Sequence, residues 1–194
     1  MFDFEILPEL EGQNIVLKLP RPTKKLAQQI FETISVSREN FEKWMPWTRK
    51  IQTFDDCLRF LKYLDQEVKQ QDKLQYLIFD KKIDRFYGLV CCYNYVPLHK
   101  RGELGVWLDL RYRGRHLAFD AVATLEKYLF ASGVHRLEIH CEPDNKSSYG
   151  LAKKLGYKKI ARLKDYRYST YQKKFCDSLY LCKINPRKFL TIEK

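Results

Sequence analysis

The stretch that decides the fold spans residues 103–118 and reads Glu-Leu-Gly-Val-Trp-Leu-Asp-Leu-Arg-Tyr-Arg-Gly-Arg-His-Leu-Ala. Its first half has the pattern of a strand, and its last residues begin an apolar helical pattern. The turn between them contains a glycine and three arginines. Unpaired backbone N–H groups at such a turn lie at the positive end of the helix dipole, where a pyrophosphate can bind. The stretch therefore predicts a strand, a phosphate-binding loop and a helix.

The residues before this stretch predict a strand, two helices and an aromatic loop. Residues 14–19 alternate as a strand, and a helix is predicted from Thr23 through Ser35. The sequence Trp-Met-Pro-Trp at residues 44–47 predicts a rigid aromatic loop. Thr53-x-x-Asp56 resembles a capping box, and it predicts the start of a helix that runs to about Gln70.

The remaining elements predict a mixed sheet. Strands over residues 74–79, 86–95 and 102–108 follow one another closely, which predicts an antiparallel meander. The order then changes, with helices predicted over 115–132 and 145–155 and strands over 136–141, 158–165 and 175–183. This order predicts an α/β fold, more exactly an α+β mixed sheet with antiparallel arms, in one domain over residues 1–194.

Composition excludes several classes of protein. At 194 residues with 45% hydrophobic residues, the chain can bury a substantial core without metals or disulfides. The N-terminus is acidic, and no apolar run approaches the roughly 20 residues that span a bilayer. The six cysteines lack Cys-x-x-Cys spacing, which predicts reduced core thiols and no metal site. We therefore expect a cytoplasmic protein that does not bind membranes.

Positive charge is concentrated near the C-terminus. The formal net charge is +12, and residues 153–194 contain thirteen Lys/Arg against three Asp/Glu. Such a segment attracts a phosphorylated cofactor, an acidic protein or RNA, and it repels polycations. The alternative is a solvated surface that has no dedicated partner.

A second motif makes a family resemblance specific. Residues 145–157 read Asn-Lys-Ser-Ser-Tyr-Gly-Leu-Ala-Lys-Lys-Leu-Gly-Tyr. The turn at residues 111–116 resembles the Arg/Gln-x-x-Gly-x-Gly/Ala loop of GNAT N-acetyltransferases, and the second motif resembles their Asn-x-x-(Ser/Ala) helix that ends in Leu-Gly-(Phe/Tyr). Residues 44–47 and 104–108 further resemble the RimJ/RimL branch, which acetylates ribosomal proteins. The resemblance covers roughly residues 14 to 183.

The resemblance implies a GNAT-like fold, with a parallel splayed pair of strands at the centre and helices on both faces. It also implies acetyl-CoA as a co-substrate, with the exposed backbone of residues 105–108 pairing with its pantetheine arm. The cofactor-binding residues that it implies are Val106, Trp107, Leu108, Arg111, Arg113, Gly114, Arg115, His116, Leu117, Asn145 and Ser148.

Two positions depart from the family pattern. His116 stands where the loop usually ends in glycine or alanine, and Ala152 stands where many members carry a tyrosine that protonates the departing thiolate. The RimJ/RimL branch carries a serine three residues after the asparagine, so Ser148 is the expected acid, with Tyr149 as an alternative. The expected general base is Glu103, and Asp165 is second. For each of these residues the alternative to a catalytic role is a structural one, as a solvated side chain or one that hydrogen-bonds the backbone.

Four interpretations follow: two catalytic functions, one binding function and, because of His116 and Ala152, an inactive acetyltransferase fold. The first is acetylation of the N-terminal α-amine of a protein of the ribosomal type, by direct attack in a ternary complex. The second is acetylation of a small amine, such as an amino acid, a polyamine or an antibiotic. The third is an RNA-binding or ribosome-associated module on the same fold. The tryptophans Trp44, Trp47 and Trp107 either line the acceptor cleft or pack in the core. The sequence leaves both a monomer and a homodimer open.

Overall fold

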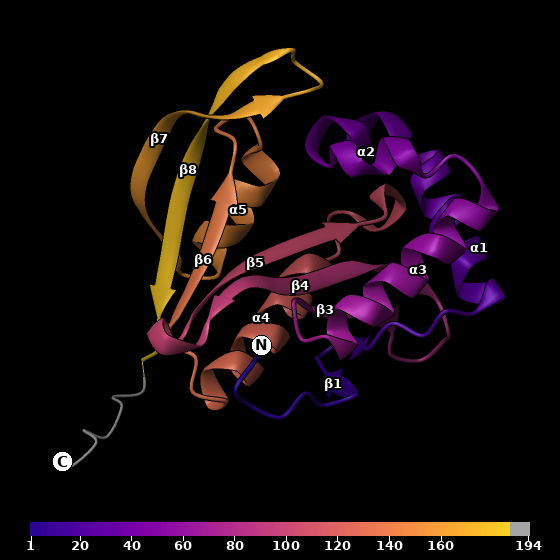
Figure 1. Cartoon of the computed structure of the whole chain (residues 1–194), viewed down its shortest axis with the longest axis horizontal. Coiled ribbons are helices and arrows are strands. Elements are labelled where there is room, and N and C mark those ends of the chain that lie inside the picture. Colours follow the sequence, from indigo (N-terminus) through magenta and orange to yellow (C-terminus); the bar gives the residue numbers. More distant parts are fainter. Residues whose placement is uncertain (187–194) are drawn as a thin grey trace.

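The computed structural model describes residues 1–186, in which eight strands form one sheet of order β1-β2-β3-β4-β5-β6-β8-β7. Neighbouring strands are antiparallel except β5 and β6, which are parallel. Figure 1 shows the sheet dividing at this pair. The strands are β1 (Glu9–Glu11), β2 (Ile15–Lys18), β3 (Leu74–Asp80), β4 (Phe86–Val96), β5 (Arg101–Leu108), β6 (Arg136–Cys141), β7 (Lys158–Ser169) and β8 (Lys174–Ile184).

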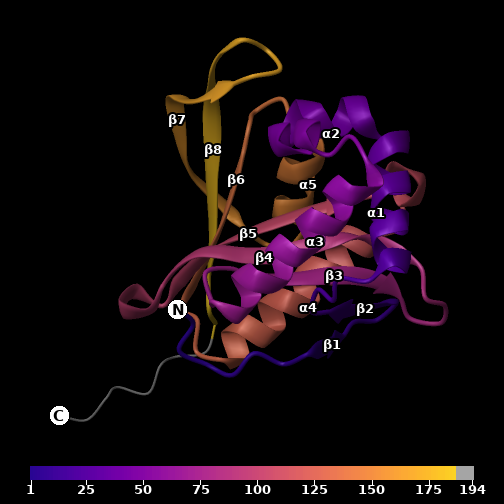
Figure 2. The same cartoon turned by 45° about the vertical axis from the view of Figure 1, so that its right-hand side comes forward.

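Five α-helices cover the sheet. They are α1 (Lys24–Val36), α2 (Arg38–Trp44), α3 (Phe54–Lys69), α4 (Leu117–Ala131) and α5 (Lys146–Lys154). Three short 3₁₀ helices occupy Pro46–Lys50, Pro97–His99 and Leu110–Tyr112. Figure 2 shows α1 and α3 on one side of the sheet and α4 on the other. Among residues 1–186, no helix combines the length and the apolar character that a membrane crossing requires.

Local sequence explains where the long helices begin. The Thr23 hydroxyl accepts a hydrogen bond from the backbone N–H of Leu26 and so caps α1. At α3 the capping box is complete, because the Thr53 side chain accepts from the Asp56 backbone and the Asp56 side chain accepts from the Thr53 backbone. Both caps satisfy N–H groups that the first turn of a helix leaves without partners.

Two apolar clusters pack on opposite faces of the sheet. One contains Leu125 and Ala152 from α4 and α5, and the other contains Ile30 and Leu61 from α1 and α3. Strand β3 lies between them and is buried at every position before Asp80. A central strand that is covered on both faces loses the polar alternation of a surface strand, which accounts for its mainly apolar sequence. The buried Gln75 is polar, and its side chain donates to Glu67.

The structure confirms the predicted mixed sheet, the antiparallel arms and the helices on both faces. Two local expectations are wrong. The predicted aromatic loop at residues 44–47 is the end of α2 followed by a 3₁₀ turn that begins at Pro46. Strand β1 was not expected, because three residues carry too short a pattern to detect. The last eight residues of the basic C-terminal segment, 187–194, lie outside the described residues.

Candidate active site

The parallel strands β5 and β6 pair over only three residues each. Their register joins Arg101 to Arg136, Gly102 to Leu137 and Glu103 to Glu138, and then the pairing ends. Both strands continue, β5 to Leu108 and β6 to Cys141, and Figures 1 and 2 show them diverging. The separation leaves one backbone edge of each strand without a partner strand.

The hydrogen-bond pattern identifies which groups of β5 face this separation. The backbone N–H of Asp109 donates to the carbonyl of Tyr87, and no register shift interrupts the pairing of Gly88 with Leu108 through Tyr93 with Glu103. Because antiparallel residues alternate along the ladder, Gly105 and Trp107 exchange their backbone bonds with β4. The backbone groups of Leu104, Val106 and Leu108 therefore point away from β4. Leu104 still pairs with β6 through the bridge of Glu103 with Glu138, so Val106 and Leu108 are the residues that can pair with an extended amide-containing ligand.

The loop after β5 adds a cluster of free N–H groups. Gly114 and His116 both have left-handed backbones, with φ of 77° and 58°, and His116 occupies the N-cap position of α4 without a side-chain cap. Within the described chain, no protein acceptor bonds the N–H groups of residues 114–119. A Cβ added at Gly114 would meet nothing within 4 Å, so the concave side of the loop is open. These features fit a phosphate group.

The three arginines of the loop have different roles. Arg111 donates from Nε to both carboxylate oxygens of the buried Asp109, at 3.0 and 2.9 Å. Burial acts to raise the pKa of Asp109, but hydrogen bonds from Arg111 and Thr33 outweigh it and hold this pKa below its ordinary value. Arg111 therefore anchors the loop. Arg113 and Arg115 are exposed, and Arg115 lies over the Tyr112 ring at 5.5 Å.

Glu103 lies at the point where the pairing of β5 and β6 ends. Its Oε1 accepts from the Tyr93 hydroxyl at 2.5 Å, and its Oε2 accepts from Asn94 Nδ2 at 3.2 Å. Burial and the neighbouring Glu103 raise the pKa of Tyr93, so its hydroxyl keeps the proton that it donates. Both partners of Glu103 are neutral.

The other two glutamates on this side of the separation are neutralised. Glu138, the register partner of Glu103, accepts from Arg136 and Arg101 at 2.6 and 3.3 Å. Glu142, just beyond β6, accepts from Arg167 at 2.6 Å. Burial acts to raise the pKa of Glu138, but its hydrogen bonds to Tyr180 and Arg136 outweigh that effect and lower it. Glu103 is therefore the glutamate of the three whose negative charge has no cationic partner.

Helix α5 brings the second motif to the other side of the separation. Asn145 caps the helix by accepting from the Ser148 backbone at 3.2 Å. The Ser148 side chain hydrogen-bonds the buried thiol of Cys141, at the end of β6, and burial raises the pKa of that thiol. Ala152 is fully buried one turn later, so the residue that replaces the family tyrosine is part of the core. Tyr149 packs at the edge of the same core.

Asp165 is distant from this arrangement. It lies on β7, which is separated from β6 by β8, and its backbone donates to Asp177 on β8. Its backbone is left-handed at φ of 46°, at an irregularity of the β7–β8 register. The strand order therefore favours Glu103 over Asp165 as the group beside the separation.

The tryptophans divide between the core and the rim. The Trp107 ring packs between Phe41 and Phe86, with ring centroids at 5.5 and 5.7 Å, and Trp47 stacks on Phe60 at 4.8 Å. Trp44 lies under Lys43, whose Nζ is also 6.0 Å from the Tyr171 ring. Lys43 thus links α2 to the turn of the β7–β8 hairpin, and in Figure 1 this turn leans toward α2 across the opening of the separated strands.

Sequence reasoning missed three residues of the site. Tyr93 and Asn94 orient Glu103 from the neighbouring strand, and Asp109 holds Arg111. The antiparallel register pairs Tyr93 with Glu103, so a correct alignment of the two strands would have found the tyrosine. Asn94 has a left-handed backbone at a register shift, and no pattern in the sequence marks that position.

Solved structures of similar shape come from acetyltransferases. The microcin self-immunity acetyltransferase MccE, in complex with acetyl-CoA and AMP, superimposes with a TM-score of 0.81 at 23% identity, over 89% of this chain and 93% of its own. RimL, a ribosomal-protein α-N-acetyltransferase in complex with coenzyme A, superimposes with a TM-score of 0.81 at 15% identity, over 91% of this chain and 97% of its own. Both show that the fold is shared.

Sequence comparison gives the family. A protein of Escherichia coli (strain K12) named ribosomal-protein-serine acetyltransferase is 22% identical over 142 residues, which cover 73% of this chain and 78% of that protein. The sequence model of the acetyltransferase (GNAT) domain matches residues 16–158, from β2 to the start of β7. The chain therefore belongs to the GNAT family of acetyl-CoA-dependent N-acetyltransferases.

Proposed function

We propose that this protein transfers the acetyl group of acetyl-CoA to the N-terminal α-amine of a protein, in a ternary complex held between β5 and β6. The observation that carries the proposal is the ending of the parallel pairing at Glu103, beside a carboxylate without a cationic partner. The named relatives RimL and ribosomal-protein-serine acetyltransferase support the choice of acceptor.

The cofactor side of the proposal uses backbone groups. Val106 and Leu108 pair with the pantetheine arm, and the loop around Gly114, with its free N–H groups, holds the pyrophosphate. Arg113, Arg115 and the N-terminus of α4 at Leu117 add positive potential. Trp107 contributes less than its two neighbours, because its backbone bonds β4 and its ring packs in the core.

The acceptor side depends on Glu103. An amine must lose its proton before it attacks, and an α-amine has a pKa of about 8, against about 10.4 for a lysine side chain. Glu103 attracts the ammonium form and accepts its proton, directly or through one water. Bound acetyl-CoA supplies the activated acetyl group, and the Ser148 hydroxyl supplies the proton that the released sulfur needs. Holding both substrates together contributes further to the rate.

The role of Glu103 predicts a defined loss in the variant Glu103→Gln. Turnover of an N-terminal peptide at pH 7 should fall by about 100-fold or more, because general base catalysis contributes roughly 10² to 10⁴. The deficit should shrink above about pH 9, where the amine is neutral without help. Initial rates between pH 6 and 10 measure both effects.

Two controls accompany this measurement. Asp165→Asn removes the other candidate carboxylate and should leave the rate unchanged, since Asp165 lies on β7. Calorimetric titration should show that Glu103→Gln binds acetyl-CoA as the wild type does. Full activity in Glu103→Gln would remove Glu103 from the mechanism, and a parallel screen with small amines would show whether the acceptor class is wrong instead.

The phosphate loop is tested by changing its charge without changing its backbone. Gly114→Glu and Gly114→Gln impose the same strain at φ of 77°, and they differ by one negative charge. We expect the wild type to bind acetyl-CoA with a micromolar Kd, Gly114→Gln to bind more weakly, and Gly114→Glu to show no binding by calorimetry. Equal binding by both variants would contradict a pyrophosphate site at this loop.

A further inference from the structure

Strand β7 is exposed to an unusual degree for a strand of this sheet. Nine of its twelve residues are exposed. Because successive side chains of a strand point to opposite faces, these exposed residues lie on both faces of the sheet. It is the last strand of the sheet and pairs with β8 alone. Figures 1 and 2 show α5 beside β6 and β7 at the outer rim. The core of the protein therefore does not account for the side chains of β7.

The same hairpin carries cations that no acid balances. Residues 158–184 contain eight Lys/Arg and two Asp/Glu. Arg162 pairs with Asp177, Arg167 with Glu142 and Lys183 with Glu126. Five exposed lysines have no ion pair among the described residues. Lys164 is one of them, and its charge helps to lower the pKa of Asp177. The other four are Lys158, Lys159, Lys173 and Lys174.

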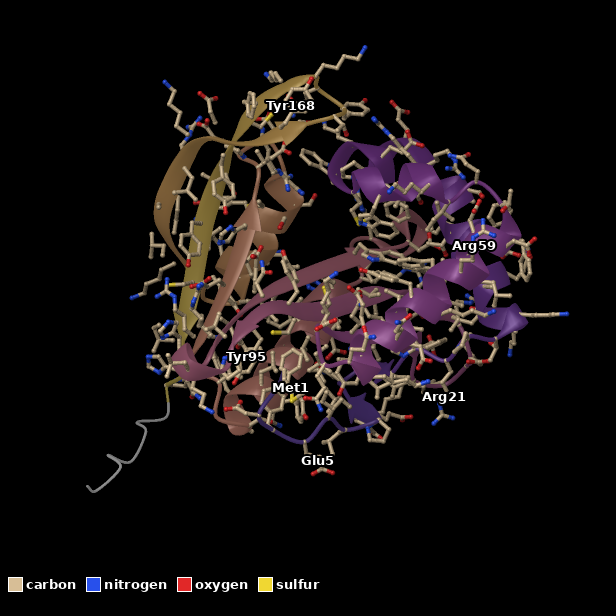
Figure 3. The ribbon with its side chains drawn as sticks, in the orientation of Figure 1. Met1, Glu5, Arg21, Arg59, Tyr95 and Tyr168 are labelled. Atoms are coloured by element: carbon tan, nitrogen blue, oxygen red, sulfur yellow. The ribbon has the colours of Figure 1, made fainter. Side chains whose placement is uncertain are left out.

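Aromatic rings lie at the turn end of the hairpin, next to Lys173 and Lys174, whereas Lys158 and Lys159 lie at the other end of β7. Tyr166, Tyr168, Tyr171 and Phe175 are 55, 52, 40 and 61% exposed. Tyr168 and Phe175 contact each other edge to face, with ring centroids 5.4 Å apart, and Figure 3 shows Tyr168 at the end of the hairpin away from the rest of the sheet. Exposed rings in line with lysines along one hairpin provide stacking faces and phosphate contacts for the same extended ligand. We define the hairpin surface as these four aromatic rings together with Lys158, Lys159, Lys173 and Lys174.

The observations favour one occupant of the hairpin surface. Acetyl-CoA between β5 and β6 is separated from β7 by two strands. A second copy would bring one lysine-rich hairpin against another, and the like charges would repel. A membrane contacts one face, whereas the exposed residues of β7 lie on both. An acidic peptide would use the lysines and leave the rings without a role.

We propose that the hairpin surface binds single-stranded RNA, with the lysines contacting phosphates and the rings stacking on unpaired bases. Strand β7 runs over twelve residues, with an irregularity at Asp165, and a strand of this length offers a long surface to a linear polyanion. The lysines and rings of this surface have no part in the acetyl transfer proposed above, so either assignment can fail without the other.

The charge component is tested with a fluorescein-labelled 12-nucleotide oligouridine and the full chain, by fluorescence anisotropy at several salt concentrations. The logarithm of the affinity should fall with the logarithm of salt by about 0.7 for each phosphate contact. The variant Lys158→Gln, Lys159→Gln, Lys173→Gln, Lys174→Gln should flatten this slope by about 2 to 3 and weaken binding at low salt.

A matched variant controls for net charge. Lys24, Lys50, Lys62 and Lys82 are also exposed lysines without an ion pair in the described chain, and they lie away from the hairpin. Changing these four to glutamine lowers the net charge by the same amount. This control should bind RNA with the wild-type slope, and an equal loss in both variants would overturn the assignment to the hairpin.

The stacking component separates RNA from other anions. Tyr168→Ala with Phe175→Ala should weaken RNA binding by roughly 5- to 100-fold and leave the salt slope unchanged, because the rings carry no charge. Unchanged melting temperature and acetyl-CoA binding show that the variant is folded. The proposal is overturned if the ring variant binds RNA as the wild type does, if polyglutamate or phosphatidylserine vesicles compete as well as RNA, or if acetyl-CoA displaces the RNA.

Discussion

His116 shows how one backbone angle explains a family preference. The position needs a left-handed backbone, with φ of 58°, at the N-cap of α4. Glycine adopts this conformation without the steric cost that a Cβ introduces. The sequence marked His116 as a departure because its side chain stands near the phosphate loop. The structure gives a second reason, since the backbone itself favours glycine.

The two left-handed positions of the loop predict stability changes of opposite sign. His116→Gly should stabilise the protein by about 0.5 kcal/mol, because relief of the left-handed strain exceeds the extra entropy of an unfolded glycine. Gly114→Ala should destabilise it by about 1 kcal/mol. Thermal unfolding should therefore shift up by about 1–2 °C for the first variant and down by about 2–4 °C for the second. A lower melting temperature for His116→Gly would show that the side chain makes a favourable contact.

Glu103 shows what the sequence can and cannot predict about a single residue of the site. Its place at the start of a strand was enough to nominate it. The choice between Glu103 and the nearby Glu138 and Glu142 depends on arginines, and Arg101 and Arg167 reach these glutamates from other strands. Only the folded chain therefore shows which carboxylate lacks a cation. The same reason hides Tyr93, whose role depends on the register of β4 with β5.

At the scale of elements, strong local signals predicted helices well. The capping box at Thr53 and Asp56 predicted the start of α3, and the structure confirms it with both hydrogen bonds. The strands of the central sheet were also found, because their apolar runs are long. The sequence analysis did not predict α2, because its seven residues are too few to show a helical period, and it assigned Trp44 to a loop.

The capping box predicts a pH-dependent effect of Thr53→Ala. The Thr53 hydroxyl and the backbone N–H groups of Gln52 and Thr53 lower the pKa of Asp56 from 3.8 to about 2. At pH 7 the substitution should cost about 1 kcal/mol, as the loss of a helix cap does. Because the folded-state pKa is the lower one, the carboxylate contribution is complete above about pH 4 and is lost as the pH falls toward 2.

Chemical denaturation at pH 7 and between pH 4 and 2 measures this effect. The difference between the wild type and Thr53→Ala should narrow through the acidic range. Thr53→Ser keeps the hydroxyl and should follow the wild type throughout. A constant difference at all these pH values would mean that Asp56 does not take part in the cap.

For the whole molecule, the mixed sheet followed from the order of elements, whereas the separation of β5 from β6 followed from the family resemblance alone. No residue pattern in β5 or β6 indicates where their parallel pairing ends. The strand order also could not be read from the sequence, because β8 lies between β6 and β7. This insertion moves Asp165 away from the catalytic candidates and moves the hairpin surface away from the cofactor loop.

The separated strands also bear on how the protein behaves in storage. The free backbone groups of Val106 and Leu108 form an inner edge that an extended segment of another chain can join, in the way that unprotected sheet edges nucleate aggregation. A ligand that pairs with this edge also blocks it. Coenzyme A should then act as a solubility agent for this protein, slowing its precipitation in proportion to occupancy even when no acetyl group is present.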